Sequence, residues 1–198
     1  MKSIITVTFF GILTCAFATY IPYKIKNCLD VTPMPNFQPG QFFNGTWYVT
    51  HAKNGTLVTV CHKYITKTDQ NSKFSFDYGY YKNGNGGAFI RVHCEQTTTK
   101  NSKFSFNCKV VEGQGSSGFL QYTVDLTFIG TDYNNYAIFY RCVPFGDGFA
   151  DNFLVLHRNK EDENSQVEPI LLKQKPKLLI DDFFHREQSN CRENPEFS

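Results

Sequence analysis

A two-residue alternation of apolar and polar side chains, repeated in short segments, restricts the fold of this chain more than any other feature. In residues 74–80 aromatic side chains occupy every second position, and small or polar ones lie between them. Residues 120–128 alternate in the same way. Because successive side chains of a strand point to opposite faces, both segments are expected to be strands with one wet face. Such patterns predict strands at residues 46–51, 57–66, 73–81, 88–98, 104–111, 119–129, 136–143 and 151–158.

Turn residues separate these segments and favour antiparallel connections between consecutive strands. About eight antiparallel strands in series fit an all-β, up-and-down barrel, a closed sheet that leaves a chamber for one small ligand. A sandwich of two sheets fits the periodicity nearly as well. After the last strand, Ser165 and Glu168 have the form of a capping box, which predicts a short C-terminal helix ending before Pro176. Residues 19–41 contain several prolines and are expected to lack regular structure.

The start of the chain has the composition of a secretion signal. Lys2 is followed by an almost entirely apolar run that ends in Ala16-Phe17-Ala18. This pattern predicts a signal peptide over residues 1–18, which is too short to span a bilayer. The mature chain, residues 19–198, is then one secreted domain. Its net charge falls from +2 to about +1 when Lys2 is removed, and without a basic patch neither nucleic acid nor a membrane is an expected partner.

Six cysteines remain after Cys15 leaves with the signal peptide. An even number of cysteines in an oxidising compartment predicts three disulfides, and a monomer is expected because no thiol is left over. One pairing follows from the hairpin around residues 99–103. If Thr98 pairs with Phe104, then Cys94 lies opposite Cys108, close enough for a disulfide.

No catalytic or metal-binding motif is present in the sequence. Cys61 and His62 are adjacent, so on a strand they point to opposite faces, and the histidines are scattered. No cysteine and histidine spacing fits a zinc site. The sequence therefore predicts a protein that is not an enzyme and holds neither a metal nor another cofactor.

A chamber for a lipid mediator needs a long apolar lining and a cation or hydroxyl groups near its mouth, which hold the carboxylate of the ligand. We expect Arg91 or Arg141 to supply the cation. A biogenic amine would need a buried carboxylate instead, and Asp77 and Asp125 lie on the polar face of their strands. The aromatic residues expected to line the chamber are Tyr78, Tyr80, Tyr122, Tyr140, Phe76 and Phe139.

Three motifs in this order resemble those of the lipocalins. Gly45 and Trp47 form a Gly-x-Trp motif, residues 131–133 read Thr-Asp-Tyr, and Arg158 follows the last predicted strand. The resemblance implies an eight-stranded lipocalin barrel whose closed end holds the indole against the guanidinium. The structural residues of these motifs are Gly45, Trp47, Thr131, Asp132, Tyr133 and Arg158.

Within the lipocalins, the surroundings of these motifs resemble the salivary triabin family of blood-feeding bugs. Residues 42–51, 131–137 and 151–158 carry this resemblance. It implies the disulfides Cys28–Cys142 and Cys61–Cys191, and a secreted, anti-haemostatic protein without enzymatic activity. Members that capture thromboxane, prostaglandin or leukotriene inhibit platelet aggregation and vasoconstriction, and this is the function expected here. The alternative is a protein whose outer loops block contact-phase coagulation proteins, factor XII and kininogen.

The sequence also contains two N-glycosylation sequons. Asn54-Gly55-Thr56 falls in a predicted turn, where a glycan is expected to be accommodated. Asn44-Gly45-Thr46 overlaps the Gly-x-Trp motif and is expected to be too tightly packed.

Overall fold

The computed structural model describes residues 24–56, 58–83, 86–113, 121–162 and 166–195. The predicted signal peptide, residues 1–18, lies outside these ranges. None of the helices in the described ranges is long and apolar enough to cross a membrane. The strands are β1 (Lys24–Ile25), β2 (Gly45–Ala52), β3 (Lys63–Thr68), β4 (Phe74–Tyr81), β5 (Phe89–Lys100), β6 (Lys103–Glu112), β7 (Gln121–Thr131), β8 (Tyr136–Phe145), β9 (Gly148–His157) and β10 (Phe184–His185). The helices are α1 (Pro39–Phe42) and α2 (Val167–Leu171), with 3₁₀ turns η1 (Thr59–Cys61), η2 (Ile180–Asp182) and η3 (Arg186–Gln188).

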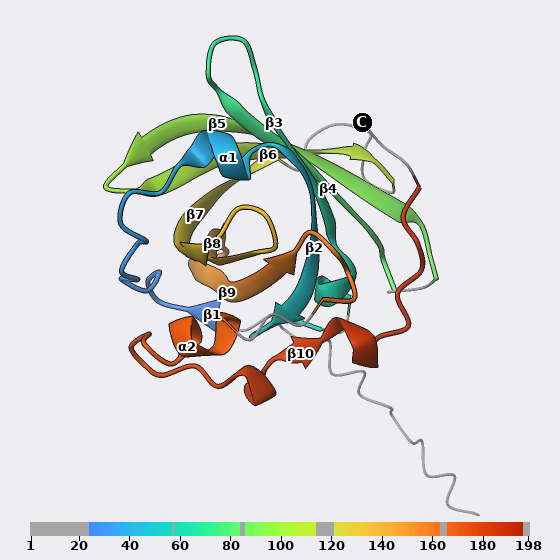
Figure 1. Cartoon of the computed structure of the whole chain (residues 1–198). Helices are drawn as coiled ribbons and strands as arrows, with labels where there is room; N and C mark the ends of the chain where they lie inside the picture. The colour runs from blue at the N-terminus through green and yellow to red at the C-terminus, as the bar shows by residue number, and fades with distance from the viewer. Residues whose placement is uncertain (1–23, 57, 84–85, 114–120, 163–165, 196–198) are drawn as a thin grey trace, which may run out of the picture.

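Strands β2 to β9 form a closed, eight-stranded antiparallel barrel (Figure 1). Each strand pairs with the next along the chain, and β9 pairs with β2 to close the ring, with Tyr48 opposite His157. The predicted up-and-down barrel is therefore confirmed, and the sandwich is excluded. Two short strands missed by the sequence analysis extend the sheet outside the ring, where β1 pairs with β9 and β10 pairs with β2.

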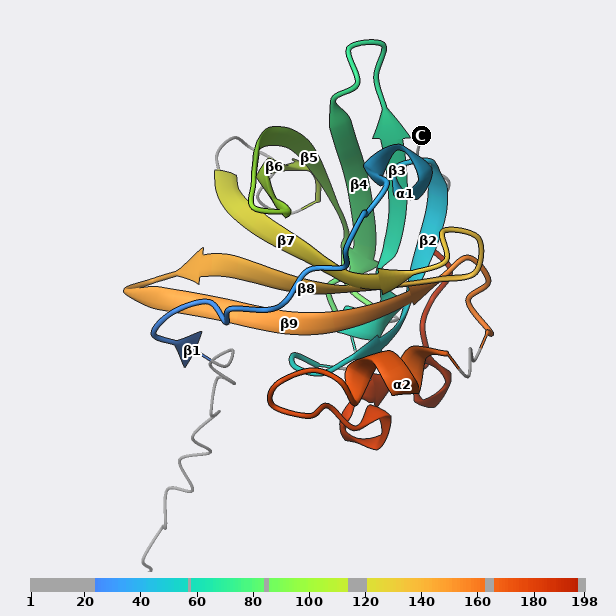
Figure 2. The same cartoon turned by 60° about the vertical axis from the view of Figure 1, so that its left-hand side comes forward.

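The barrel has an aromatic interior and, on one side, a second apolar layer outside the sheet. Trp47, Phe106 and Phe128 are among the buried interior residues. On the outer side of β8 and β9, Ile138 and Val155 pack with residues of the C-terminal segment around α2. This segment lies outside the barrel next to β9 (Figure 2). Strands β8 and β9 are therefore covered on both sides, unlike the strands with one wet face that were predicted at residues 74–80 and 120–128.

Two local predictions need correction. Residues 57–66 were expected to form one strand, but η1 turns the chain first and β3 begins only at Lys63. In the β5–β6 hairpin Thr98 pairs with Ser105, because a bulge between Gln96 and Thr98 shifts the register. The hairpin therefore closes with a tight two-residue turn at 101–102, where both residues have positive φ.

The cysteine pairing agrees with all three expected disulfides. Cys28–Cys142 joins the N-terminal segment to β8, and Cys61–Cys191 joins η1 to the C-terminal tail. Cys94 and Cys108 lie directly opposite each other on β5 and β6, so the predicted opposition survives the register shift.

The ends of the described chain contain short regular elements. Residues 19–41 were expected to lack regular structure, but their described part, 24–41, contains β1 and the start of α1. In the C-terminal segment, α2 ends at Leu171, earlier than Pro176. Gln166 occupies its N-cap without a side-chain capping bond, and Ser165 of the predicted capping box lies outside the described residues.

Candidate ligand-binding site

One end of the barrel is closed by the Gly-x-Trp motif and the arginine that follows β9. The guanidinium of Arg158 lies 3.6 Å from the centroid of the Trp47 ring. Its Nη1 donates to Thr46 O at 2.8 Å, and its Nε and Nη2 donate to Tyr133 O at 3.3 and 3.2 Å. On the other side of the indole, Phe42 of α1 stacks at 5.2 Å between ring centroids. The predicted stacking of the indole and the guanidinium is confirmed, and it leaves this end filled.

The Thr-Asp-Tyr motif forms the turn between β7 and β8 that supports Arg158. Thr131 Oγ1 donates to Tyr136 O at 2.6 Å and accepts from Tyr133 N at 2.8 Å. Asp132 Oδ1 accepts from the backbone nitrogens of residues 134–136. Partial burial would raise the pKa of this carboxyl, but the hydrogen bonds it accepts lower it below its usual value. The turn therefore holds the Tyr133 carbonyl where the guanidinium can reach it.

Arg141 lies inside the barrel, toward the other end. It pairs with Leu126 of β7 and Asn152 of β9 on the inner face of the sheet. Its guanidinium lies 5.6 Å from the centroid of the Tyr78 ring. Burial disfavours the charged guanidinium, but the surrounding tyrosines raise the pKa of Arg141 above its usual value. The side chain is therefore a permanent cation.

Tyrosines on three strands, β3, β4 and β7, surround this cation. Tyr64 on β3 and Tyr78 on β4 are 5.3 Å apart between ring centroids, and the Tyr78 hydroxyl hydrogen-bonds to that of Tyr122 on β7. Burial raises the pKa of Tyr64 and of Tyr122, so both phenols stay neutral. Neutral phenols solvate a guanidinium but do not cancel its charge.

No carboxylate of the described chain compensates Arg141. The ion pairs among the described residues involve other cations, and none brings a carboxylate oxygen within 4.0 Å of this guanidinium. Asp151 lines the same cavity as Arg141, but its Oδ2 accepts from the Tyr140 hydroxyl at 2.9 Å and its Oδ1 accepts from Asn54 Nδ2 at 3.2 Å. The charge of Arg141 is therefore available to an anionic ligand.

A cavity of about 230 Å³ adjoins Arg141. His62 also lines this cavity and is 7% exposed, with its ring 4.6 Å from that of Tyr80. Its Nδ1 is buried and has no hydrogen-bond partner. Burial and the charges of Arg141 and Arg186 lower the pKa of His62 to about 3, so the imidazole is neutral. The cavity is lined by Asn54, Gly55, Thr59, His62, Arg141, Val143, Ala150, Asp151 and Asn152.

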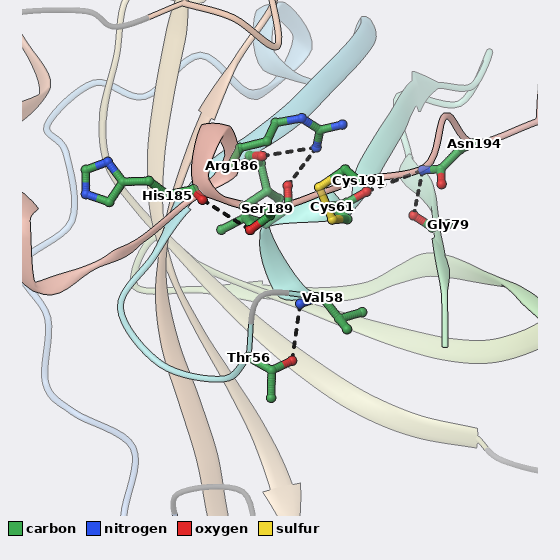
Figure 3. The surroundings of a disulfide bond; sticks show 11 residues. Thr56, Val58, Cys61, Gly79, His185, Arg186, Ser189, Cys191 and Asn194 are labelled. Carbon is green, nitrogen blue, oxygen red and sulfur yellow. Dashed lines mark hydrogen bonds between the residues drawn. A yellow bond between two sulfur atoms is a disulfide. The ribbon is translucent and has the colours of Figure 1, made fainter. Parts of the chain in front are cut away.

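The C-terminal tail fixes the segment that carries His62 (Figure 3). Cys191 is bonded to Cys61, the residue before His62, and Arg186 Nη1 donates to Val60 O at 2.6 Å. Asn194 Nδ2 donates to Gly79 O on β4 at 3.0 Å. The disulfide and the hydrogen bonds of the tail, which lies outside the barrel, therefore fix the backbone that positions the imidazole at the cavity.

Two of the predicted ligand-binding residues lie outside the barrel. Arg91 pairs across the sheet with Gly79, on the face opposite Tyr78, and forms an ion pair with Asp77 at 3.1 Å. The expectation that Arg91 supplies the chamber cation is therefore wrong. Tyr140 is also on the outer face, where its hydroxyl accepts from Leu29 N at 2.9 Å.

The structure brings the remaining predicted residues to the inner face and adds two that were missed. Six of the eight expected residues face inward. Arg141 lines the cavity, Tyr78, Tyr80 and Tyr122 lie near its guanidinium, and Phe76 and Phe139 belong to the barrel core. Tyr64 and His62 were missed, although they occupy alternate positions of one segment, as inward residues of a strand do. The outer-face position of Asp77 and Asp125 is as expected, but Asp77 is buried beneath its partners, at 4% exposure.

The two sequons have the reverse of the expected accessibility. Asn54 is half-buried, and its Nδ2 donates to Asp151 O and Oδ1, both at 3.2 Å. Asn44 is exposed at the start of β2. Among the described residues, no group of three or more His, Cys, Asp or Glu side chains is arranged to hold a metal ion.

Comparison with known proteins places this architecture in a family. Residues 18–169 match the sequence profile of the triabin family. Triafestin-2 of Triatoma infestans is 40% identical over 196 residues, which cover 94% of this chain and 91% of the relative. Triabin of Meccus pallidipennis is 36% identical over 172 residues, which cover 86% of this chain and 99% of the relative.

Solved structures share the fold. The amine-binding protein of Rhodnius prolixus, in its tryptamine complex, superimposes with a TM-score of 0.69 at 23% identity, over 82% of this chain and 87% of that one. A complex of LTBP1 with leukotriene C4 superimposes with a TM-score of 0.55 at 30% identity, over 77% of this chain and 90% of that one. The lipocalin barrel, the three motifs and these relatives agree, and the chain belongs to the triabin family.

Proposed function

We propose that the protein is secreted into saliva and sequesters a small hydrophobic host mediator that carries a carboxylate, of the thromboxane, prostaglandin or leukotriene type. Removing such a mediator would inhibit platelet aggregation and vasoconstriction. The observation that carries the proposal is Arg141, a cation inside an aromatic barrel with no carboxylate partner among the described residues.

The chemistry of the chamber favours an anion over an amine. A guanidinium and a carboxylate form paired, charge-assisted hydrogen bonds, which are stronger when water is excluded. An ammonium ligand would need an inward carboxylate, but Asp77 and Asp125 lie on the outer face and Asp151 is already hydrogen-bonded. The ligand's apolar part would contact the neutral rings of Tyr64 and Tyr78. The relative LTBP1, which is described in complex with leukotriene C4, supports a ligand of this class.

Calorimetric titration of the disulfide-bonded protein tests the proposal. A thromboxane mimic, a cysteinyl leukotriene, serotonin and ADP are titrated in one buffer. We expect near one-to-one binding of at least one eicosanoid and no heat with serotonin or ADP. Binding of serotonin alone would contradict the proposal. The absence of binding heat with all four ligands would also contradict it, and a contact-activation clotting assay would then test whether the outer loops inhibit coagulation proteins.

Two arginine variants make the test specific. Losing a charge-assisted hydrogen bond costs about 1.5–3 kcal/mol, so Arg141→Met should weaken eicosanoid binding roughly 10- to 100-fold. Arg91→Met is the matched control, because it removes the same charge from the outer face and should leave the affinity unchanged. Equal affinity of the wild type and Arg141→Met would remove Arg141 from the proposal.

A further inference from the structure

The imidazole of His62 has an unmet hydrogen-bonding capacity. Its Nδ1 is buried without a partner, in a side chain that is 7% exposed. A buried polar atom left unpaired costs about 1–3 kcal/mol, so such atoms in folded proteins usually have a partner. His62 lines the 230 Å³ cavity next to Arg141, and this volume exceeds what one water molecule needs.

The other polar groups of the cavity wall are already engaged with one another. Asn54 N donates to Asn152 Oδ1 at 2.8 Å, and Asn152 Nδ2 donates to Asn54 O at 2.7 Å. Thr59 Oγ1 accepts from Thr56 N at 3.3 Å. Arg141 offers only donors. Among the residues that line the cavity, His62 is therefore the one with a buried polar atom that has no hydrogen-bond partner. This partner must come from the occupant of the cavity.

The chemistry of the site indicates which kind of partner His62 takes. A neutral imidazole carries a proton on one ring nitrogen and a lone pair on the other. Burial and the positive charges of Arg141 and Arg186 keep the imidazole of His62 neutral. In the tautomer with the proton on Nε2, the lone pair lies at Nδ1, the buried atom without a partner. A lone pair at this atom accepts from a hydroxyl group and repels a carboxylate oxygen. A ligand with only a carboxylate would therefore satisfy Arg141 and leave His62 unpaired.

We propose that His62 Nδ1 accepts a hydrogen bond from a hydroxyl group near the carboxylate of the ligand, so that the chamber selects hydroxylated lipid acids over plain fatty acids. The inference rests on the proposed function, because it takes the carboxylate to be at Arg141. The hydroxyl must lie within a few bonds of the carboxylate, because the guanidinium of Arg141 and the imidazole of His62 line one cavity and both lie against Tyr78, at 5.6 and 5.3 Å from its ring centroid.

The test compares three acids of one chain length: palmitate, β-hydroxypalmitate and ω-hydroxypalmitate. One added hydrogen bond is worth about 1 kcal/mol, so the wild type should bind the β-hydroxy acid roughly 5-fold more tightly than palmitate. The ω-hydroxy acid, whose hydroxyl is at the far end, should show no gain. In His62→Phe the ratio of the two affinities should fall to about one, whatever the absolute affinity of the variant for palmitate.

His62→Gln keeps an acceptor and should retain part of the preference, and near-ultraviolet circular dichroism shows whether both variants are folded. A preference for the β-hydroxy acid that persists in His62→Phe would overturn the inference, as would equal binding of all three acids by the wild type. Failure of all three acids to bind would overturn it too. The eicosanoid titrations judge the proposed function separately, since they include ligands that do not depend on His62.

Discussion

Two arginines, Arg141 on β8 and Arg158 directly after β9, have different roles at opposite ends of the barrel. At the closed end, Arg158 uses three of its nitrogens on backbone carbonyls and stacks on Trp47. Near the cavity, Arg141 lies against neutral tyrosine rings, with no carboxylate partner in the described chain. A guanidinium whose donors are satisfied by the protein holds the fold together. A guanidinium that contacts only neutral side chains keeps its charge available for a ligand.

The largest effect that would sharpen this contrast is the loss of the closed-end arginine. Arg158→Met removes three hydrogen bonds and one cation–π contact, so the free energy of unfolding should fall by about 4 kcal/mol. Arg141→Met should leave it unchanged or raise it, because burying a charge without a carboxylate partner costs free energy in the folded state. Urea denaturation of both variants measures the difference. Equal destabilisation would break the comparison.

The stability of the protein should depend on pH through His62, the histidine at the cavity. Folded His62 stays neutral down to about pH 3, whereas the same imidazole in the unfolded chain gains a proton near pH 6.5. The unfolded state therefore binds more protons in this window, and stability falls as the pH falls, by about 1.4 kcal/mol per pH unit at most.

His51, whose pKa burial lowers to about 4, adds to the same trend. Only the difference between the wild type and His62→Phe therefore isolates His62. Between pH 6.5 and 4.5 the variant should lose about 2 kcal/mol less than the wild type, as measured by denaturation at each pH. Parallel stability curves would show that His62 is not the buried neutral group described above.

A smaller change in the free energy of unfolding is expected when Tyr140 is substituted. The sequence analysis assigned this residue to the chamber lining. Its hydroxyl bridges Leu29 N and Asp151 on the outer face. Tyr140→Phe should lower the free energy of unfolding by about 1–2 kcal/mol and leave eicosanoid affinity unchanged. Calorimetry of this variant beside Tyr78→Phe, an inward tyrosine, tests the assignment of faces. Weaker binding by Tyr140→Phe alone would contradict it.

The smallest energetic effect is expected from glycosylation, whose two possible sites lie at the closed end and at the cavity. We expect Asn44, exposed near the closed end, to carry a glycan and Asn54 to remain free, because the amide of Asn54 is held by Asp151. Peptide mass spectrometry of the protein expressed in insect cells, with and without glycosidase, distinguishes the two sites. A glycan found only on Asn54 would contradict this expectation.

The sequence predicts the barrel well and the site only in part, for reasons visible in single strands. Around Arg91 the apolar neighbours Ile90 and Val92 alternate with it, so periodicity alone already indicates its outward position. Around Arg141 both faces of β8 are buried, because the C-terminal segment covers its outer side, and alternation cannot separate Tyr140 from Arg141.

His62 depends on contacts that are distant in the sequence. Its position at the cavity follows from η1, the bond between Cys61 and Cys191, and the hydrogen bonds of the tail. A local pattern contains none of these. The same holds for the lack of a carboxylate within ion-pair distance of Arg141 in the described part of the chain, which is a property of the folded arrangement rather than of any segment.

The crystal structure of the protein with a thromboxane mimic tests the central claim most directly, because it locates the carboxylate of the ligand. The account predicts this carboxylate inside the barrel, with its oxygens about 3 Å from the guanidinium nitrogens of Arg141. A ligand whose carboxylate points to solvent, or one bound on the outer face near Arg91, would contradict it.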